Sequence, residues 1–140
     1  MTIWKQTYDV AQANAFNKNT IAEPLGLLFT EIGPDYLVGT MPVDKRTHQP
    51  MGILHGGASV VLAESLGSFA AHMATNENMA CVGLDINANH IRSVRSGLVT
   101  GIARPVHIGR RTHVWEIHIT DEADKLVCLS RLTMAVIDTI

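Results

Sequence analysis

One carboxylate stands in an otherwise uncharged stretch of the chain. Residues 47–76 contain a single Asp, Glu, Lys or Arg side chain, that of Glu64. Good helix formers and alanines over residues 57–75 predict a helix, which would carry Glu64 near its middle. Most glutamates simply face solvent, whereas an enclosed carboxylate is costly unless it is paired or used. Ser68 lies one turn later on the same face and could hydrogen-bond a group that Glu64 acts on.

The segment His55-Gly56-Gly57 comes directly before this helix. A glycine pair at a helix start leaves backbone N–H groups unobstructed at the positive end of the helix dipole. Such groups suit an oxyanion or a polarised carbonyl. Two simpler interpretations stay open: the glycines only permit a tight turn, and His55 is a capping or core residue.

Gly56 and Glu64 are separated by eight residues, which corresponds to about 12 Å along one helix. A reacting carbonyl must lie about 3 Å from both its oxyanion donor and the group that attacks it. One helix cannot supply both groups, but a second copy of the chain could. Charged residues make up only 17% of the chain, against a usual share of about 25%. The spacing and the low charge together predict a homodimer with shared sites.

A basic segment follows. Between Ile86 and Trp115 there is no acidic residue, and the local charge is +5. The five arginines are Arg92, Arg95, Arg104, Arg110 and Arg111. Arginine suits phosphate recognition, although a strand edge guarded by charges is an equally common use. The net charge of −2 and the lack of interleaved aromatic residues exclude nucleic acid as the expected partner. A small phosphorylated ligand fits better.

The remaining elements are predicted from turn signals and period-two alternation. A short helix is expected over 8–18, and strands over 26–32, 35–42, 82–90, 97–106, 111–120 and 125–137. Long antiparallel strands with one good helix predict an α+β fold in which a curved sheet wraps the helix.

Two faces are expected in detail. The helix stripe that faces the sheet is Leu62, Leu66, Phe69 and Met73, and the opposite side holds Glu64, Gly67, Ser68 and Ala71. On the first strand after the helix, Val82, Leu84, Ile86, Ala88 and His90 are expected to share one face.

Length and composition set further limits. One hundred and forty residues suit a single domain over 1–140. The composition excludes disordered, collagen-like and disulfide-scaffold classes. Cys81 and Cys128 lie in apolar runs and are expected to be core residues, and no metal-ligand spacing is present. No apolar stretch approaches the length of a membrane span or signal sequence, so a cytoplasmic protein without membrane contact is expected.

Two segments carry a resemblance to a known family. QPMGILHGGASVVLAESLGSFA and VGLDINANHIRSVRSG resemble hotdog-fold acyl-CoA thioesterases of the 4-hydroxybenzoyl-CoA thioesterase type with a helix glutamate. The similarity is greatest to the enzymes that hydrolyse 1,4-dihydroxy-2-naphthoyl-CoA in menaquinone synthesis. The resemblance implies dimers that pair into a homotetramer. It implies no cofactor, since coenzyme A is part of the substrate.

The resemblance also implies roles for individual residues. Glu64 would act as nucleophile or general base, and the Gly56 N–H would bind the thioester oxygen. His55 and Gln49 would position or polarise that group, with the Ser68 hydroxyl near the attacked carbon. Contacts with substrate or coenzyme A would come from Gly83, His90, Ile91, Arg92, Ser93, His107, Ile108, Gly109, Arg110, Arg111 and Thr112.

Two alternatives stay open. A hotdog hydratase or dehydratase acting on acyl-carrier substrates also pairs a histidine with a helix carboxylate, but its multiple-proline signature is reduced here to Pro50. A non-enzymatic acyl-CoA-binding module would not need Glu64, Gln49 and His55 together. The acyl group is not specified by the sequence: menaquinone intermediates, benzoyl-type esters and medium chains all fit.

Overall fold

The computed structural model describes residues 1–139. The elements in chain order are α1 (Val10–Ala15), α2 (Ala22–Leu25), β1 (Leu28–Ile32), β2 (Leu37–Pro42), α3 (Gly56–Met73), β3 (Met79–His90), β4 (Leu98–Ile108), β5 (Thr112–Thr120) and β6 (Leu126–Asp138).

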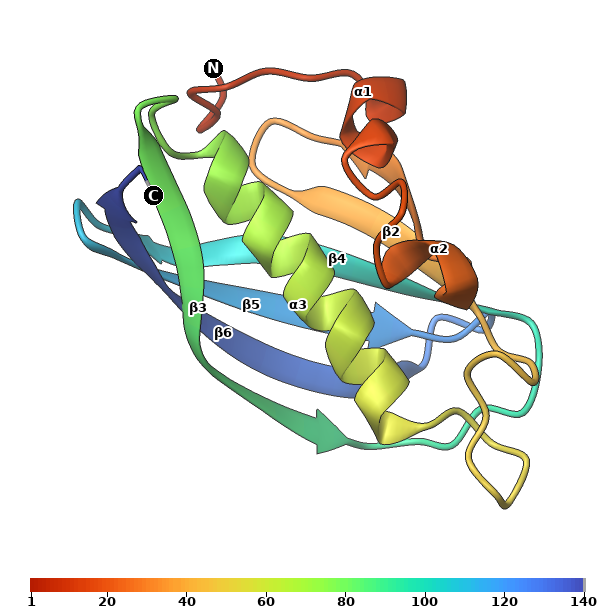
Figure 1. The fold of residues 1–140 in the computed structure, drawn as a ribbon. Helices are drawn as coiled ribbons and strands as arrows, with labels where there is room; N and C mark the ends of the chain where they lie inside the picture. Colours follow the sequence, from red (N-terminus) through yellow and green to blue (C-terminus); the bar gives the residue numbers. More distant parts are fainter. Residues whose placement is uncertain (140) are drawn as a thin grey trace.

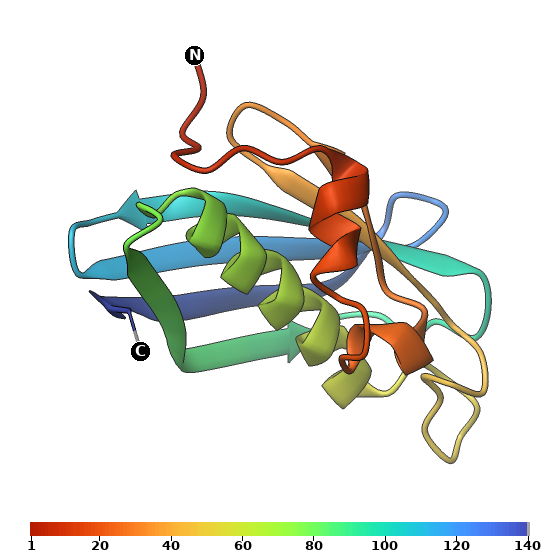
Figure 2. The same ribbon diagram turned by 45° about the horizontal axis from the view of Figure 1, so that its top comes forward.

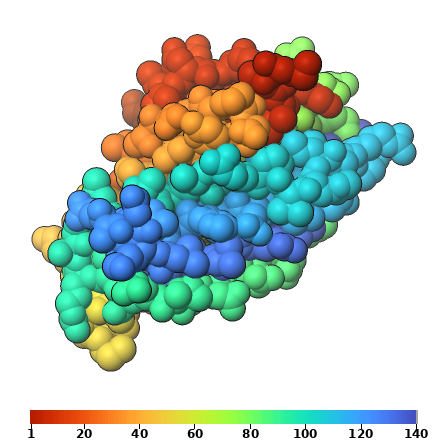
Figure 3. Space-filling view, turned by 180° about the vertical axis from the view of Figure 1, so that it is seen from behind, coloured from red at the N-terminus to blue at the C-terminus, as the bar shows by residue number. Residues whose placement is uncertain are grey.

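The six strands form one antiparallel sheet in the order β1-β2-β4-β5-β6-β3. The sheet curves around α3, which crosses its concave face (Figures 1 and 2). Figure 3 shows the opposite face, where the strands themselves form the surface down to β3 at one edge. The predicted α+β fold, a curved sheet around a central helix, is confirmed.

Helix α3 is held by a fully buried apolar stripe. Leu62, Leu66 and Met73 are 0% exposed and Phe69 is 8% exposed, as the periodicity predicted. The helix approaches the sheet closely because Gly101 has no side chain: a Cβ there would lie 2.6 Å from a methyl carbon of Leu66. The Leu66 side chain therefore lies directly against the backbone of β4 at Gly101, which leaves no room for water between helix and sheet there.

The prediction for the other side of α3 is partly wrong. Gly67 is buried, and a Cβ on it would lie 2.6 Å from a methyl carbon of Leu132 on β6. Ala71 is 0% exposed. Both therefore pack against the sheet, because small residues at the margin of the stripe let a curved sheet reach further around the helix. Glu64 and Ser68 are half-buried and do lie outside that core.

Strand β3 does not keep strict alternation. Its pairing with β6 shifts between Gly83 and Asp85, the signature of a β-bulge. Ile86 packs against the core, as predicted, but Leu84 is 63% exposed and does not share its face. The extra residue at the bulge reverses the side-chain alternation, so Cys81 rather than Val82 packs inward before it.

The N-terminal segment also differs from the prediction. The expected helix over 8–18 is confined to α1, where Asp9 and Gln12 form a capping box. The four-residue helix α2 was not predicted because it is too short to show a period. Strand β1 follows it and begins at Leu28 rather than at residue 26. Asn14 ties α1 to β1: its amide nitrogen donates to the Phe29 carbonyl and its amide oxygen accepts from the Phe29 N–H, both at 2.8 Å.

Both cysteines are free thiols that contact apolar surroundings. Cys128 is buried and Cys81 is half-buried. Burial raises the pKa of both thiols, which is the behaviour of core cysteines rather than of reactive ones. None of the helices within residues 1–139 combines the length and apolar character needed to cross a membrane.

We predict that Leu66→Ala lowers the free energy of unfolding by about 2–5 kcal/mol, because it opens a cavity between α3 and the sheet. Leu98→Ala is the matched control, since Leu98 is 44% exposed and surface substitutions cost only about 0.5 kcal/mol or less. Urea unfolding at a fixed protein concentration measures both. Equal losses for the two variants would contradict the packing described for α3.

Candidate active site

The start of α3 presents one backbone N–H group, that of Gly56, which donates to no residue in the described range 1–139. His55 is the N-cap, and its Nδ1 accepts from the Gly57 N–H at 2.8 Å. The N–H groups of Ala58 and Ser59 donate to the His55 carbonyl. Within residues 1–139, no hydrogen bond uses the Gly56 N–H. The capping interpretation of His55 is thus confirmed, and capping leaves Gly56 as the donor available to an anion or carbonyl.

A pocket of about 290 Å³ lies beside Gly56. A Cβ on Gly56 would lie 2.8 Å from Nε2 of His90, so the end of β3 is packed directly on the helix start. The lining residues are Gln49, Ile53, Leu54, Gly56, Ser59, His90, Ile91, Arg92, Ser93 and Val127. The structure therefore brings Gln49 and the segment 90–93 to Gly56. The buried Ser59 was not predicted, because an isolated serine in an apolar run carries no distinctive signal.

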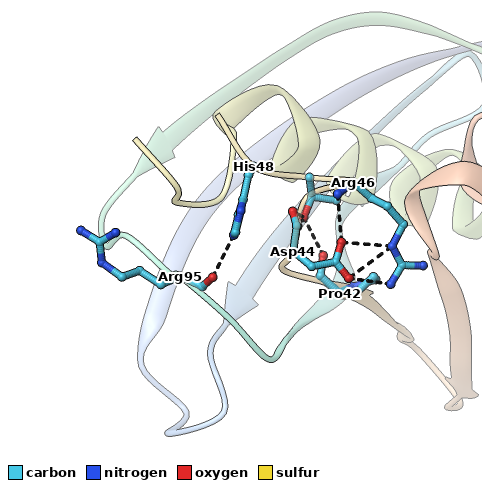
Figure 4. Close-up of polar contacts among 6 residues, drawn as sticks. Pro42, Asp44, Arg46, His48 and Arg95 are labelled. Carbon is cyan, nitrogen blue, oxygen red and sulfur yellow. Dashed lines mark hydrogen bonds and ion pairs between the residues drawn. The ribbon is translucent and has the colours of Figure 1, made fainter. Parts of the chain in front are cut away.

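The loop that carries Gln49 is fixed by the loop that carries Arg92. Figure 4 shows the His48 ring directed at the Arg95 carbonyl, with 2.8 Å between Nε2 and the oxygen. The Leu54 N–H donates to the Val94 carbonyl at 2.8 Å. The same view shows the ion pair of Asp44 and Arg46. The two bonds from His48 and Leu54 join residues 47 and 40 positions apart and make the two loops one wall.

Glu64 lies in a different pocket. This second pocket, of about 500 Å³, separates α3 from the α1–α2 segment. Its lining residues are Phe16, Asn17, Thr20, Ile21, Val60, Val61, Glu64, Ser65, Ser68, Phe69 and His72. None of the ion pairs formed within residues 1–139 includes Glu64. Gly83 faces the carboxylate: a Cβ there would lie 3.2 Å from Oε2 of Glu64.

Three polar side chains follow one line of α3 along this pocket, since Glu64, Ser68 and His72 are four residues apart. The Ser68 hydroxyl has only a weak contact with the Met134 sulfur, at 3.8 Å. His72 Nε2 lies 3.1 Å from the Tyr8 hydroxyl. Burial lowers the pKa of His72, which favours the neutral imidazole at neutral pH. The pocket therefore has an apolar body with a carboxylate, a hydroxyl and a neutral imidazole along one side.

The basic segment is divided in space. Arg110 and Arg111 line a third pocket of about 410 Å³, together with Lys5 and Met79, at the opposite end of β3 from Arg92. Arg104 belongs to neither group, because it lies 3.8 Å from Asp35 in an exposed ion pair and over the ring of Tyr36.

Two histidines, His107 and His113, lie at or beside the third pocket. His107 packs over Gly109 in the turn between β4 and β5. The buried His113 has a lowered pKa, first because of burial and then because of the charges of His107 and Lys5. This keeps His113 neutral beside the arginines.

Within one chain the predicted site residues thus form three groups: the Gly56 pocket, the Glu64 pocket and the Arg110–Arg111 pocket. The first offers an N–H donor, the second a carboxylate beside an apolar cavity, and the third a basic surface. Within residues 1–139, no three His, Cys, Asp or Glu side chains are grouped so that they could hold a metal ion. A donor and a carboxylate in separate pockets suit a site that a second copy completes.

Comparison with known proteins gives consistent relationships. The thioesterase superfamily model matches residues 51–128. The 1,4-dihydroxy-2-naphthoyl-CoA hydrolase of Escherichia coli is 50% identical, over 96% of this chain and 99% of its own. The crystal structure of a mutant thioesterase PA1618 from Pseudomonas aeruginosa has a TM-score of 0.96 and 51% identity, covering 99% of this chain and 100% of that one. Thioesterase HI1161 from Haemophilus influenzae has a TM-score of 0.96 and 48% identity, covering 98% and 96%.

We predict that His55→Ala lowers the free energy of unfolding by about 1 kcal/mol, because the Gly57 N–H loses its acceptor. His55→Asn supplies another capping acceptor and should recover most of this loss. Thermal and urea unfolding of the two variants measure the difference. Equal stability of the Ala and Asn variants would contradict the capping role.

Proposed function

Since the chain belongs to the thioesterase superfamily, we propose that it hydrolyses aromatic acyl-CoA thioesters with Glu64 of one copy and the Gly56 N–H of a second copy. The observation that carries the proposal is the Glu64 carboxylate, which lies in the wall of an apolar pocket and forms no ion pair within residues 1–139. The protein is a thioester hydrolase by its family. The acyl group, the residues and the assembly are our proposals.

The chemistry needs few groups. The Gly56 N–H donates to the thioester oxygen and stabilises the negative charge that develops there. Glu64 either attacks the carbonyl carbon, forming an anhydride that water then hydrolyses, or removes a proton from an attacking water. In both routes a C–O bond forms, the C–S bond breaks, and the proton reaches the coenzyme A sulfur. Two further donors are available: Gln49, which lines the Gly56 pocket, and the Nε2–H of His55, the residue directly before Gly56.

The edge strand β3 supports the two-copy site. It pairs with β6 on one side, and its other side is the edge of the sheet. Gly83 adjoins Glu64 and His90 adjoins Gly56. Antiparallel pairing of two β3 strands about a two-fold axis near Ile86 would therefore bring Gly56 of the partner toward Glu64. Apolar exposure supports the same contact: Leu84 on β3 is 63% exposed, and Met51 and Ile91 are also exposed.

The same pairing gives the basic groups a common role. Because paired β3 strands run in opposite directions, Arg92 of the partner would lie beside the start of β3, where Arg110 and Arg111 line the third pocket. Guanidinium groups from both copies would then contact the coenzyme A phosphates. The substrate contacts expected of His107 to Thr112 would come from the same corner. Pairing of dimers into tetramers stays a prediction.

The acyl pocket favours an aromatic group. A volume of about 500 Å³ accommodates one or two fused rings, and Phe16, Phe69 and His72 line it. The Escherichia coli relative is described as a 1,4-dihydroxy-2-naphthoyl-CoA hydrolase. We propose this ester, and with it a role in menaquinone synthesis, as the first substrate to test, with benzoyl-type esters next.

We predict that Glu64→Gln lowers kcat by at least about 100-fold, because general base catalysis alone contributes that much. Glu77→Gln is the matched control, since Glu77 is exposed and lies outside all three pockets of the site. A free-thiol assay with benzoyl-CoA measures release of coenzyme A. A hydratase or a binding module would release no thiol, and unchanged turnover of a folded Glu64→Gln variant would refute the mechanism.

A complementation experiment tests the shared site. Gly56→Val blocks the N–H donor, and Glu64→Gln removes the carboxylate, so each variant alone should be inactive. Co-refolded at equal amounts, they should recover about a quarter of wild-type activity, because half the dimers are mixed and each mixed dimer has one complete site.

The control mixes the Glu64→Gln variant with a variant that carries both Gly56→Val and Glu64→Gln. No dimer in this mixture has a complete site, because neither chain has a Glu64 carboxylate. No recovery from the first mixture, despite demonstrated subunit exchange, would show that Gly56 and Glu64 do not act across copies.

A further inference from the structure

We propose that Phe16, at the end of α1, is the outer wall of the acyl pocket and selects planar aromatic acyl groups over saturated groups of the same size. The inference rests on the proposed thioesterase site and concerns its specificity. Phe16 lies outside residues 51–128, which carry the family match, but it lines the pocket that contains Glu64.

The ring of Phe16 belongs to an aromatic cluster at the end of that pocket. Its centroid lies 5.3 Å from that of Phe69 and 5.7 Å from that of His72, with tilts of 56° and 59°. Tyr8 meets it edge-on at 5.2 Å and 78°. These are the tilted and edge-to-face arrangements in which aromatic rings attract one another. A planar acyl group entering the pocket would extend the cluster.

Phe16 also has a free surface that a substrate can cover. Phe16 as a whole residue is 51% exposed, although three aromatic rings already surround its ring. The neighbouring Ile21 is 59% exposed and lines the same pocket. An aromatic ring that covers this surface gains both apolar burial and ring–ring attraction, whereas a saturated ring gains the burial alone.

The wall is held in place by bonds that do not involve the pocket. Two hydrogen bonds of 2.8 Å join the Asn14 side chain to the Phe29 backbone on β1, two residues before Phe16. The Asp9 side chain caps the other end of α1 by accepting from the Gln12 N–H at 2.7 Å. Figure 2 shows α1 and the loop that follows it lying beside α3. Phe16 is therefore a fixed surface rather than a mobile loop residue, and a fixed surface can discriminate shapes.

The test compares benzoyl-CoA with cyclohexanecarbonyl-CoA, which have the same ring size and differ in planarity and aromaticity. Free-thiol assays give kcat/KM for the wild type, Phe16→Ala and Phe16→Leu, with Leu28→Ala as the control. Leu28 is 54% exposed and lines a different pocket. Thermal unfolding checks that each variant is folded.

We expect the wild type to prefer benzoyl-CoA. Phe16→Ala should lower kcat/KM for benzoyl-CoA by about tenfold and for the saturated ester by about twofold. Phe16→Leu keeps the apolar bulk, so it should abolish the preference while retaining turnover of the saturated ester. A preference unchanged in Phe16→Leu, or an equal fall for both esters in Phe16→Ala, would overturn the inference. A wild type that releases no thiol from either ester would instead overturn the proposed function, and this inference with it.

Discussion

The rigid spacing of Gly56 and Glu64 on α3 determines how the site can be built. Eight residues on one helix keep the N–H donor and the carboxylate about 12 Å apart, whatever the loops do. The helix cannot bend to shorten this distance, because Leu62 and Leu66 are fully buried and glycines bring the sheet into direct contact with it. In the proposed site, this packing therefore prevents one chain from bringing both groups to the same carbonyl. The exposed apolar residues and the sheet edge at β3 agree with the proposed pairing, in which a second copy supplies the other group.

The sequence predicted those features of α3 that depend on a strong pattern. The stripe of Leu62, Leu66, Phe69 and Met73 repeats every three or four residues and faces the sheet as expected. Gly67 and Ala71 were placed on the wrong side because small residues fit either a tight interface or a surface, and only the curvature of the sheet decides between them. Leu84 was misplaced for a related reason. A β-bulge depends on pairing with β6, which alternation within one strand does not reveal.

Linear neighbours also proved to be distant in space. The arginines of residues 86–115 form one basic segment in the sequence, but β4 carries the chain along the whole sheet between Arg95 and Arg110. At about 3.3 Å per residue, its eleven residues separate the two basic groups by some 35 Å. Counting charges along the chain therefore identified the arginines but not how they are grouped in space. Ser59 and Lys5 line the same pockets as these arginines but lie outside the basic segment. Only the fold shows that they are neighbours of the arginines.

Helix α3 and the N-terminal segment with α1 meet different physical requirements at the proposed acyl pocket. Catalytic groups must be held within about 0.5 Å of their working positions, and the buried helix α3 gives the proposed catalytic Glu64 a rigid support. A residue that selects the acyl group, as proposed for Phe16, needs only the right shape and surface. It can be carried by a short helix attached at one point, as α1 is attached through Asn14 and Phe29. Changes in α1 can therefore alter the acyl preference without disturbing the packing that positions Glu64. In this proposal the carboxylate belongs to the part of the chain that matches the family, and Phe16, outside that match, adjusts which acyl group is bound.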